Sequence, residues 1–333
     1  MLTPTRRTVL GLTAAVALAL PAARAQAADD VSFAMDWIIN GAHAGYFAAV
    51  EKGYYKEEGI NATISRGFGS GDTVKRLAAG RADFGVADTS ALITALANEN
   101  VPVRAVAMVY DKASLGIIYI RESGIKVPKD LEGRAIARSA AGASVNMFPG
   151  FLAVNNVDRA KIKEVVVDGA NFLPLMMSRQ VDGVLEQSIN IGRFRKQAEA
   201  QKLHADAMRY ADFGLLTYGN AILASESTVK TKPDLVKRFI RATFRGLEYA
   251  FANPDESVAI MRKANPEVDA EIGKEELIAI RELALTDHAK QHGLGKIDAA
   301  QMTSTRDIVV KALSLKREVP IGEIYADGMV TKK

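Results

Sequence analysis

The feature that most constrains the fold of this chain is a regular alternation of short strand-like runs with longer helix-like runs. Residues 31–35 place apolar side chains at every second position, which is typical of a half-buried strand. Because strands that alternate with helices tend to pair in parallel, the pattern predicts a largely parallel sheet with helices on both faces. The expected strands of this first series cover 31–35, 61–65, 84–87 and 103–109, and the expected helices cover 41–55, 73–79 and 91–98.

A second series of the same kind begins after Tyr110. Its expected strands cover 115–120, 134–137, 164–167, 182–185 and 221–224, and its expected helices cover 145–155 and 173–178. From Lys232 onward the chain is almost entirely helix-like. A stripe of large apolar side chains at helical spacing indicates a buried helix face there, formed by Leu235, Phe239, Phe244, Leu247 and Phe251.

Two such series predict an α/β protein built from two lobes. We expect the first lobe to contain residues 28–113 and 222–333, and the second lobe to contain residues 114–221. Ligands of open α/β sheets bind outside the carboxyl ends of the strands. Two facing sheets therefore place a ligand cleft between the lobes.

The N-terminal segment has the pattern of a cleavable signal peptide, which we assign to residues 1–27. Arg6 and Arg7 precede a short apolar stretch, and A-x-A cleavage sites follow at 23–25 and 25–27. The stretch is too short for a membrane span, which needs about 20 residues. The arginine pair resembles a twin-arginine signal, and a general secretory signal fits the segment equally well. The pattern predicts an exported protein.

Composition excludes several other classes of protein. The signal peptide holds three arginines and no acid, so its removal lowers the formal net charge from +4 to +1. No strongly basic surface of the kind that binds nucleic acid is then expected. The sequence contains no cysteine, which excludes disulfides, thiolate metal sites, a cysteine nucleophile and a lipid-anchored cysteine. We therefore expect a soluble periplasmic protein without a lipid anchor.

The end of the first strand gathers four side chains that suit ligand binding. Trp37, the single tryptophan of the sequence, offers a flat face on which a ring can stack. Asp36 can accept hydrogen bonds from ring or exocyclic N–H groups, and Asn40 can both donate and accept them. Each residue also has an ordinary alternative: Trp37 as part of a core, Asn40 as a helix cap and His43 as a surface group.

The motif Asp36-Trp-x-x-Asn-x-x-His-x-Gly-Tyr46, followed by Glu51-Lys-Gly-Tyr-Tyr-Lys-Glu-Glu-Gly-Ile60, resembles a known superfamily of ABC-importer solute-binding proteins. Its members are related to thiamine-pyrimidine-precursor biosynthesis and uptake and to alkanesulfonate, taurine and nitrate binding. The resemblance implies a type II periplasmic-binding-protein-like fold with a hinge and an interlobe cleft. It places Trp37, Asn40 and His43 in the pocket. It also implies a monomer that delivers its ligand to transmembrane permease subunits with a cytoplasmic ATPase.

Two glycine- and serine-rich turns precede expected helices, one in each lobe. Residues 67–72 open the helix near Thr73, and residues 139–144 open the helix near Val145. Backbone N–H groups and the partial positive charge at a helix N-terminus can hold an acceptor group of a ligand. The alternative is a tight turn with a capping side chain. The candidate ligand-binding residues in these turns are Gly69, Ser70, Gly71, Ser139, Gly142 and Ser144.

Four further candidates lie at other strand ends: Asp88, Tyr110, Glu186 and Tyr218, and the polar residues Thr89, Gln187 and Asn220 stand beside them at the same strand ends. Each of them could equally be an ordinary loop residue. A buried carboxylate such as Glu186 is costly without a partner. Three acids near one cleft, counting Asp36, argue against a simple anion and favour a ligand with N–H donors or a positive centre.

The sequence therefore predicts a binding protein for a small nitrogen heterocycle similar to the thiamine pyrimidine precursor, with no cofactor and no metal. Riboflavin-like flavins, hydantoins, aromatic carboxylates and sulfonates remain alternative ligands. The rival class is an enzyme similar to the pyrimidine synthases of the superfamily, which consume an active-site histidine with iron and carry a cysteine-rich motif. The absence of cysteine and the export signal argue against it. His288 and His292 have metal-ligand spacing, but we favour a solvated helix face as the explanation for this pair.

Overall fold

The computed structural model describes residue 1, residues 28–315 and residues 317–331. The predicted signal peptide thus lies outside the described residues except for Met1. Within the described part of the chain, no helix is both long and apolar enough to cross a membrane.

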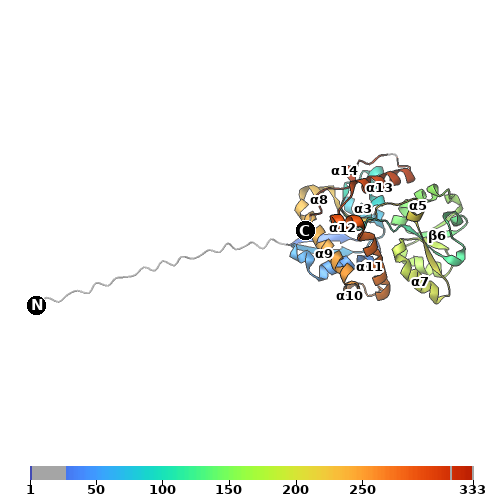
Figure 1. The fold of residues 1–333 in the computed structure, drawn as a ribbon, viewed down its shortest axis with the longest axis horizontal. Helices are drawn as coiled ribbons and strands as arrows, with labels where there is room; N and C mark the ends of the chain where they lie inside the picture. The colour runs from blue at the N-terminus through green and yellow to red at the C-terminus, as the bar shows by residue number, and fades with distance from the viewer. Residues whose placement is uncertain (2–27, 316, 332–333) are drawn as a thin grey trace.

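The chain forms two five-stranded sheets, one in each of two bodies that lie side by side (Figure 1). The first sheet has the order β2-β1-β3-β10-β4 and the second has the order β7-β6-β8-β5-β9. The strands of the first sheet are β1 (Asp29–Ala34), β2 (Ile60–Ser65), β3 (Phe84–Asp88), β4 (Val103–Met108) and β10 (Asn220–Ser225). Those of the second are β5 (Gly116–Ile120), β6 (Ala135–Arg138), β7 (Lys163–Val166), β8 (Gly183–Leu185) and β9 (Ala205–Arg209).

Both sheets are mixed, which corrects the expectation of largely parallel sheets. In the first sheet β10 runs antiparallel to both β3 and β4, and in the second sheet β5 runs antiparallel to both β8 and β9. The run 221–224, which ends the second series along the sequence, is part of β10 and pairs in the first sheet. The chain passes from the first sheet to the second after β4 and returns after β9. The strand that follows each passage, first β5 and then β10, runs antiparallel to its two neighbours.

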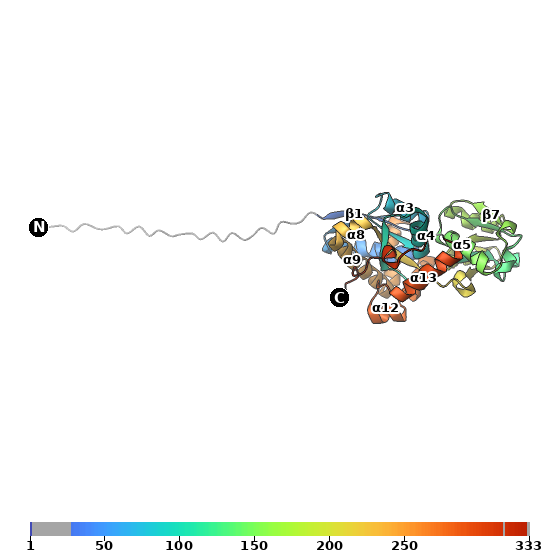
Figure 2. The ribbon, with the colours of Figure 1, turned by 90° about the horizontal axis from the view of Figure 1, so that it is seen from above.

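Helices cover the faces of both sheets (Figures 1 and 2). The second body carries α5 (Ala143–Val154), α6 (Phe172–Met177) and α7 (Ile191–Ala200). The first body carries α1 (Ala44–Glu51), α2 (Tyr54–Glu57), α3 (Ser70–Ala78), α4 (Thr89–Glu99), α8 (Glu226–Thr231) and α9 (Pro233–Ala252). The remaining C-terminal helices are α10 (Pro254–Ala264), α11 (Ala270–Ala284), α12 (Asp287–His292), α13 (Ala299–Ala312) and α14 (Ile321–Ile324).

Three elements, β9, α7 and α8 (Glu226–Thr231), have no counterpart among the sequence-based expectations. The burial of β9 follows no strict alternation along Ala-Asp-Ala-Met-Arg, so a period of two is not visible in its sequence. Only Phe194 and Ala198 of α7 are buried, which leaves too narrow an apolar stripe for a clear helical pattern.

The core of the first lobe is built around α9. Phe239 is fully buried, stacks on Phe84 with ring centroids 3.9 Å apart, and meets Phe33 edge-on at 4.9 Å. The neighbouring helix α1 approaches α9 at Gly45 and Gly246, where an added Cβ on either glycine would overlap the facing helix. All five residues of the predicted apolar stripe are buried, which confirms that expectation.

The C-terminal helices complete the first lobe and also contact the second. Helix α13 packs against α4 of the first lobe and against α5 of the second, and it lies across both bodies in Figures 1 and 2. Gly150 of α5 and Ala312 of α13 mark the close approach, because a Cβ on Gly150 would lie 2.5 Å from that of Ala312. This helix therefore joins the lobes on one side of the cleft.

Candidate functional site

The carboxyl ends of the strands meet between the lobes, and a small cavity lies there. Its volume is about 10 Å³, which leaves room for about one water molecule. A heterocyclic ring therefore needs the walls of this cavity to move apart. The lining residues are Asp36, Trp37, Ser70, Gly142, Ala143, Ser144, Leu185, Glu186 and Gln187.

Asp36 is buried and its carboxylate accepts hydrogen bonds from three side chains. Oδ1 lies 3.0 Å from Nε2 of His43, and Oδ2 accepts from Nδ2 of Asn220 at 2.7 Å. Nε2 of Gln187, which belongs to the second lobe, lies 3.5 Å from the same Oδ2. The carboxylate is thus held in one orientation at the wall of the cavity.

The tautomer of His43 follows from its two contacts. Nδ1 accepts the backbone N–H of Asn40 at 3.2 Å, so the ring proton of neutral His43 must lie on Nε2 and be donated to Asp36. Asn40 caps the following turn through its Oδ1, which accepts the N–H of Ala42 at 3.1 Å. Asn40 therefore does fill the alternative role of a helix cap. Its Nδ2 additionally donates to Oδ1 of Asn190 in the second lobe at 2.9 Å.

Trp37 extends from the first lobe into the second. It is 8% exposed and packs in an apolar cluster whose other buried members lie between positions 118 and 205. Its ring centroid is 6.2 Å from that of Phe172, and a Cβ on Gly169 would lie 2.9 Å from its Cη2. The indole therefore packs in a core, which is one of the two roles weighed from the sequence, and it also lines the cavity.

Glu186 provides a second buried carboxylate, and it has the partners that such a group needs. It accepts from the backbone N–H of Gln187 at 2.8 Å, from Nδ2 of Asn190 at 3.0 Å and from Nη2 of Arg193 at 2.9 Å. Burial raises the pKa of Glu186, and the charge of Arg193 opposes that rise. The nearby indole N–H of Trp37 also favours the ionised form and lowers the pKa.

The two glycine-rich turns face each other across the cleft. The backbone N–H of Gly71 donates to the carbonyl oxygen of Ala141 at 3.1 Å. Ser70 Oγ accepts the N–H of Asp88 at 3.0 Å, and Ser144 Oγ accepts the N–H of Gly116 at 3.1 Å. Each of these two serine hydroxyls thus accepts a hydrogen bond from a backbone N–H group of its own lobe. The hydrogen bond that connects the two turns across the cleft is the backbone bond between Gly71 and Ala141.

Asp88 and Tyr110 lie behind the cavity wall. Asp88 caps α4 by accepting the N–H of Ser90 at 2.9 Å, and Ser90 Oγ bonds to the same oxygen. Burial raises the pKa of Asp88 to about 6. Burial also raises the pKa of the Tyr110 phenol well above its ordinary value, and the charge of Asp36 adds to this rise. Neither residue is among those that line the small cavity.

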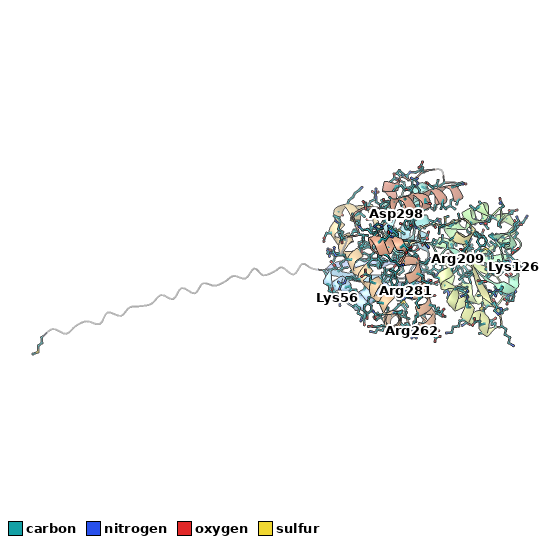
Figure 3. The ribbon with its side chains drawn as sticks, in the orientation of Figure 1. Lys56, Lys126, Arg209, Arg262, Arg281 and Asp298 are labelled. Carbon is teal, nitrogen blue, oxygen red and sulfur yellow. The ribbon has the colours of Figure 1, made fainter. Side chains whose placement is uncertain are left out.

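Tyr218, a candidate ligand-binding residue, does not line the small cavity. Its hydroxyl accepts the backbone N–H of Asp298 at 3.0 Å, and its own N–H donates to Thr305 Oγ1 at 2.9 Å. Asp298, labelled in Figure 3, lies among the C-terminal helices of the first lobe. Tyr218 is fully buried against these helices, so its side chain fixes the C-terminal region to the first lobe.

Six of the candidates proposed from the sequence line the cavity, and the strand-end rule also named Gln187 and Asn220, but Asn190 was omitted. Gln187, Asn190 and Asn220 contact Asp36, Asn40 or Glu186. Gln187 directly follows Glu186, and Asn220 is the first residue of β10, so both carry the strand-end signal. Asn190 lies in a short turn with no such signal.

His288 and His292 lie side by side on α12, with ring centroids 4.8 Å apart. Nδ1 of His288 faces Oδ2 of Asp111 at 3.7 Å. Among the described residues, no group of three histidine, cysteine or acidic side chains is gathered closely enough to hold a metal ion.

We expect Gly69→Ala to weaken ligand binding roughly 2- to 12-fold, the worth of one hydrogen bond. Gly69 has φ = 129° and ψ = 151°, a conformation open almost only to glycine, and an added Cβ would overlap the backbone of Ala141. The neighbouring bond between Gly71 and Ala141 should break. Gly80→Ala is the control, since Gly80 also has positive φ but open space around it. Calorimetric titration that gave equal affinities for both variants would contradict this prediction.

The two-lobed α/β architecture with its interlobe cavity is a periplasmic-binding-protein-like fold. Solved structures of this shape include the alkanesulfonate-binding protein SsuA from Xanthomonas axonopodis, with a TM-score of 0.69, 15% identity and coverage of 90% of this chain and 99% of that one. A Candida albicans protein described as having the generic periplasmic binding protein fold gives a TM-score of 0.68 at 16% identity, covering 91% and 98%. At these identities the likeness establishes the fold alone.

The chain belongs to the NMT1/THI5-like family, whose model matches residues 40–257. This confirms the resemblance indicated by the sequence motifs. Curated relatives include the riboflavin-binding protein RibY of Chloroflexus aurantiacus, 26% identical over 95% of this chain and 91% of that protein. The formylaminopyrimidine-binding protein of Halalkalibacterium halodurans is 23% identical over 71% of each chain. A 4-amino-5-hydroxymethyl-2-methylpyrimidine phosphate synthase of Legionella pneumophila is 24% identical over 72% and 74%.

Proposed function

We propose that this protein is the solute-binding component of an ABC importer and captures a flat nitrogen heterocycle between its lobes. The observation that carries the proposal is the pair of buried carboxylates, Asp36 and Glu186, that line the same cavity as Trp37. Acceptor-only groups suit a ligand with N–H donors, and an indole face suits a ring. A thiamine-pyrimidine-precursor-like compound has both properties.

A flavin is the second candidate ligand. It also combines a flat ring with N–H and acceptor groups, and the relative named as riboflavin-binding covers nearly the whole chain. In either case the lobes must separate to admit the ring, by the hinge motion usual for two-lobed binding proteins. The permease subunits and their ATPase would then receive the ligand from the closed form, which we take to be a monomer.

A panel of ligands tested by thermal shift on the mature protein distinguishes these candidates. A ligand at 100 times its Kd adds about 2.7 kcal/mol to stability, so a true ligand should raise the melting temperature clearly. The panel contains aminopyrimidines, riboflavin, a hydantoin, an aromatic carboxylate and an alkanesulfonate. A stabilising effect of the sulfonate alone would refute the heterocycle while retaining the binding role.

The synthase relatives make an enzyme the rival function. The proposed role is better supported, because Nε2–H of His43 is engaged with Asp36 and the sequence has no cysteine. The described residues around His43 do not form a metal site, so they do not fit the iron of such a reaction. Mass spectrometry of the peptide that contains His43, after incubation with iron(II) and air, should show no change. A mass loss at His43 would favour the enzyme.

Trp37→Ala should reduce affinity for a ring ligand by about 1–3 kcal/mol, as is usual for loss of a stacking aromatic side chain. Wild-type fluorescence should change on ligand addition, and the sequence has no second tryptophan to obscure the signal. Trp37→Phe is the matched variant, since it keeps an aromatic ring in the second-lobe cluster. If Trp37→Ala unfolds the protein while Trp37→Phe binds normally, Trp37 serves the core and not the ligand.

Export is a separate part of the proposal. We expect the mature protein to begin near Gln26 or Ala28, because the A-x-A sites lie immediately before these residues. N-terminal sequencing of the protein recovered from the periplasm tests this. Recovery of the intact Met1 terminus from the cytoplasm would refute both export and the importer role.

A further inference from the structure

A second, larger cavity lies on the other side of Trp37 from the acids. Its volume is about 260 Å³, compared with about 10 Å³ for the cavity beside Asp36 and Glu186. It is formed at the carboxyl ends of the outer strands β2 and β7, with Trp37 as the wall shared by both cavities. We call it the outer subsite, and its walls include Trp37, Arg66, Phe68, Ser139, Val166 and Asp168.

Two residues of the outer subsite, Trp37 and Ser139, carry a buried polar atom that has no hydrogen-bond partner. Ser139 is 4% exposed, and its buried Oγ makes no hydrogen bond within the structure. A buried hydroxyl without a partner is costly. The sequence placed Ser139 among the residues that hold a ligand. Its hydroxyl has no competing partner, and separation of the lobes must uncover it before a ligand can reach it.

The outer subsite is lined by one cationic side chain, Arg66, and one anionic side chain, Asp168. Arg66 stacks over the ring of Phe68 at 4.6 Å. Asp168 accepts the N–H of Ala170 through Oδ1 at 2.9 Å, and its carboxylate charge remains. One cation and one anion at the same cavity favour neither an anionic nor a cationic group. They suit neutral hydroxyls, which can both donate and accept.

Two exposed apolar side chains border the outer subsite. Phe68 belongs to the first lobe and is 53% exposed, and Val166 belongs to the second and is 57% exposed. Exposure of large apolar side chains on both sides of one cavity is consistent with contact to the carbon atoms of a bound chain.

We propose that the heterocycle carries a neutral hydroxylated chain and that this chain binds in the outer subsite. This inference rests on the proposed function and narrows its ligand class. The ring lies beside Trp37, Asp36 and Glu186, and the hydroxyls of the chain pair with Ser139, Asp168 and Arg66. A bare aminopyrimidine would leave the Ser139 hydroxyl unpaired, so the outer subsite favours a flavin-like ligand.

Riboflavin and lumichrome provide the test, because they share the tricyclic ring and only riboflavin carries the hydroxylated chain. We expect wild-type protein to bind riboflavin at least tenfold more tightly than lumichrome in equilibrium titrations. Ser139→Ala should weaken riboflavin roughly 2- to 12-fold, the worth of one hydrogen bond, and leave lumichrome unchanged. Ser139→Ala should not lower the melting temperature, since its hydroxyl has no partner to lose.

Val166→Trp fills the outer subsite from its exposed side and should weaken riboflavin at least tenfold without affecting lumichrome. Val127→Trp is the matched control, because Val127 is 47% exposed in the same lobe and lines neither cavity. Equal binding of the two compounds by wild type, or equal weakening of both by Val166→Trp, would overturn the inference. Binding of an aminopyrimidine but of neither tricyclic compound would overturn it and leave the proposed function intact. Binding of none of the three would overturn the proposed ligand class itself.

Discussion

Asp36→Asn is expected to weaken the binding of a ring with N–H donors about 10- to 150-fold. The carboxylate accepts hydrogen bonds only, whereas an asparagine amide also donates, so one charge-assisted bond worth about 1.5–3 kcal/mol is lost. The amide would also turn its NH₂ toward either Nε2–H of His43 or Nδ2–H of Asn220, both of which are donors. Calorimetric titration with an aminopyrimidine and with riboflavin measures the effect.

Asp72→Asn is the control for the change in charge, since Asp72 lies in the first turn of α3 and does not line the cavity. Its affinity should equal that of wild type. An alkanesulfonate titrated against Asp36→Asn should bind no more weakly than to wild type, because removal of a negative charge cannot repel an anion. Wild-type protein that binds the sulfonate and no heterocycle would contradict the ligand assignment. The importer role would remain.

Phe239→Ala should lower the free energy of unfolding by about 3–5 kcal/mol, which is the usual cost of deleting a buried aromatic ring. The ring is fully buried between Phe84, Phe33 and Tyr55, and the surrounding strands and helix cannot close the resulting cavity. Urea denaturation followed by circular dichroism measures the loss.

Phe68→Ala is the matched control for this variant. It removes the same atoms from a side chain that is 53% exposed, so we expect a change within about 0.5 kcal/mol. Similar losses for the two variants would show that the aromatic cluster around α9 does not dominate the stability of the first lobe.

Much of the architecture could be predicted from local patterns. Residues 84–87 form a continuous apolar run, residues 103–108 form one that only Arg104 interrupts, and the stripe of α9 repeats at helical spacing, so neighbours along the chain reveal them. The strand-end rule then placed Asp36, Trp37, Ser70 and Glu186 at one cavity. In contrast, β9 and α7 lack a clear period and were missed for that reason.

The sequence by itself determined most of the segments that form strands and helices and many of the polar side chains that follow them, because these properties depend on residues a few positions apart. Only the tertiary structure decided the antiparallel entry of β10 and β5, the insertion of Trp37 into the second lobe and the attachment of Tyr218 to the C-terminal helices. The partners of Asp36 were decided in the same way, since Gln187 and Asn220 stand 151 and 184 positions away. Contacts over such separations depend on how the two lobes pack together, and no local period or propensity contains that information.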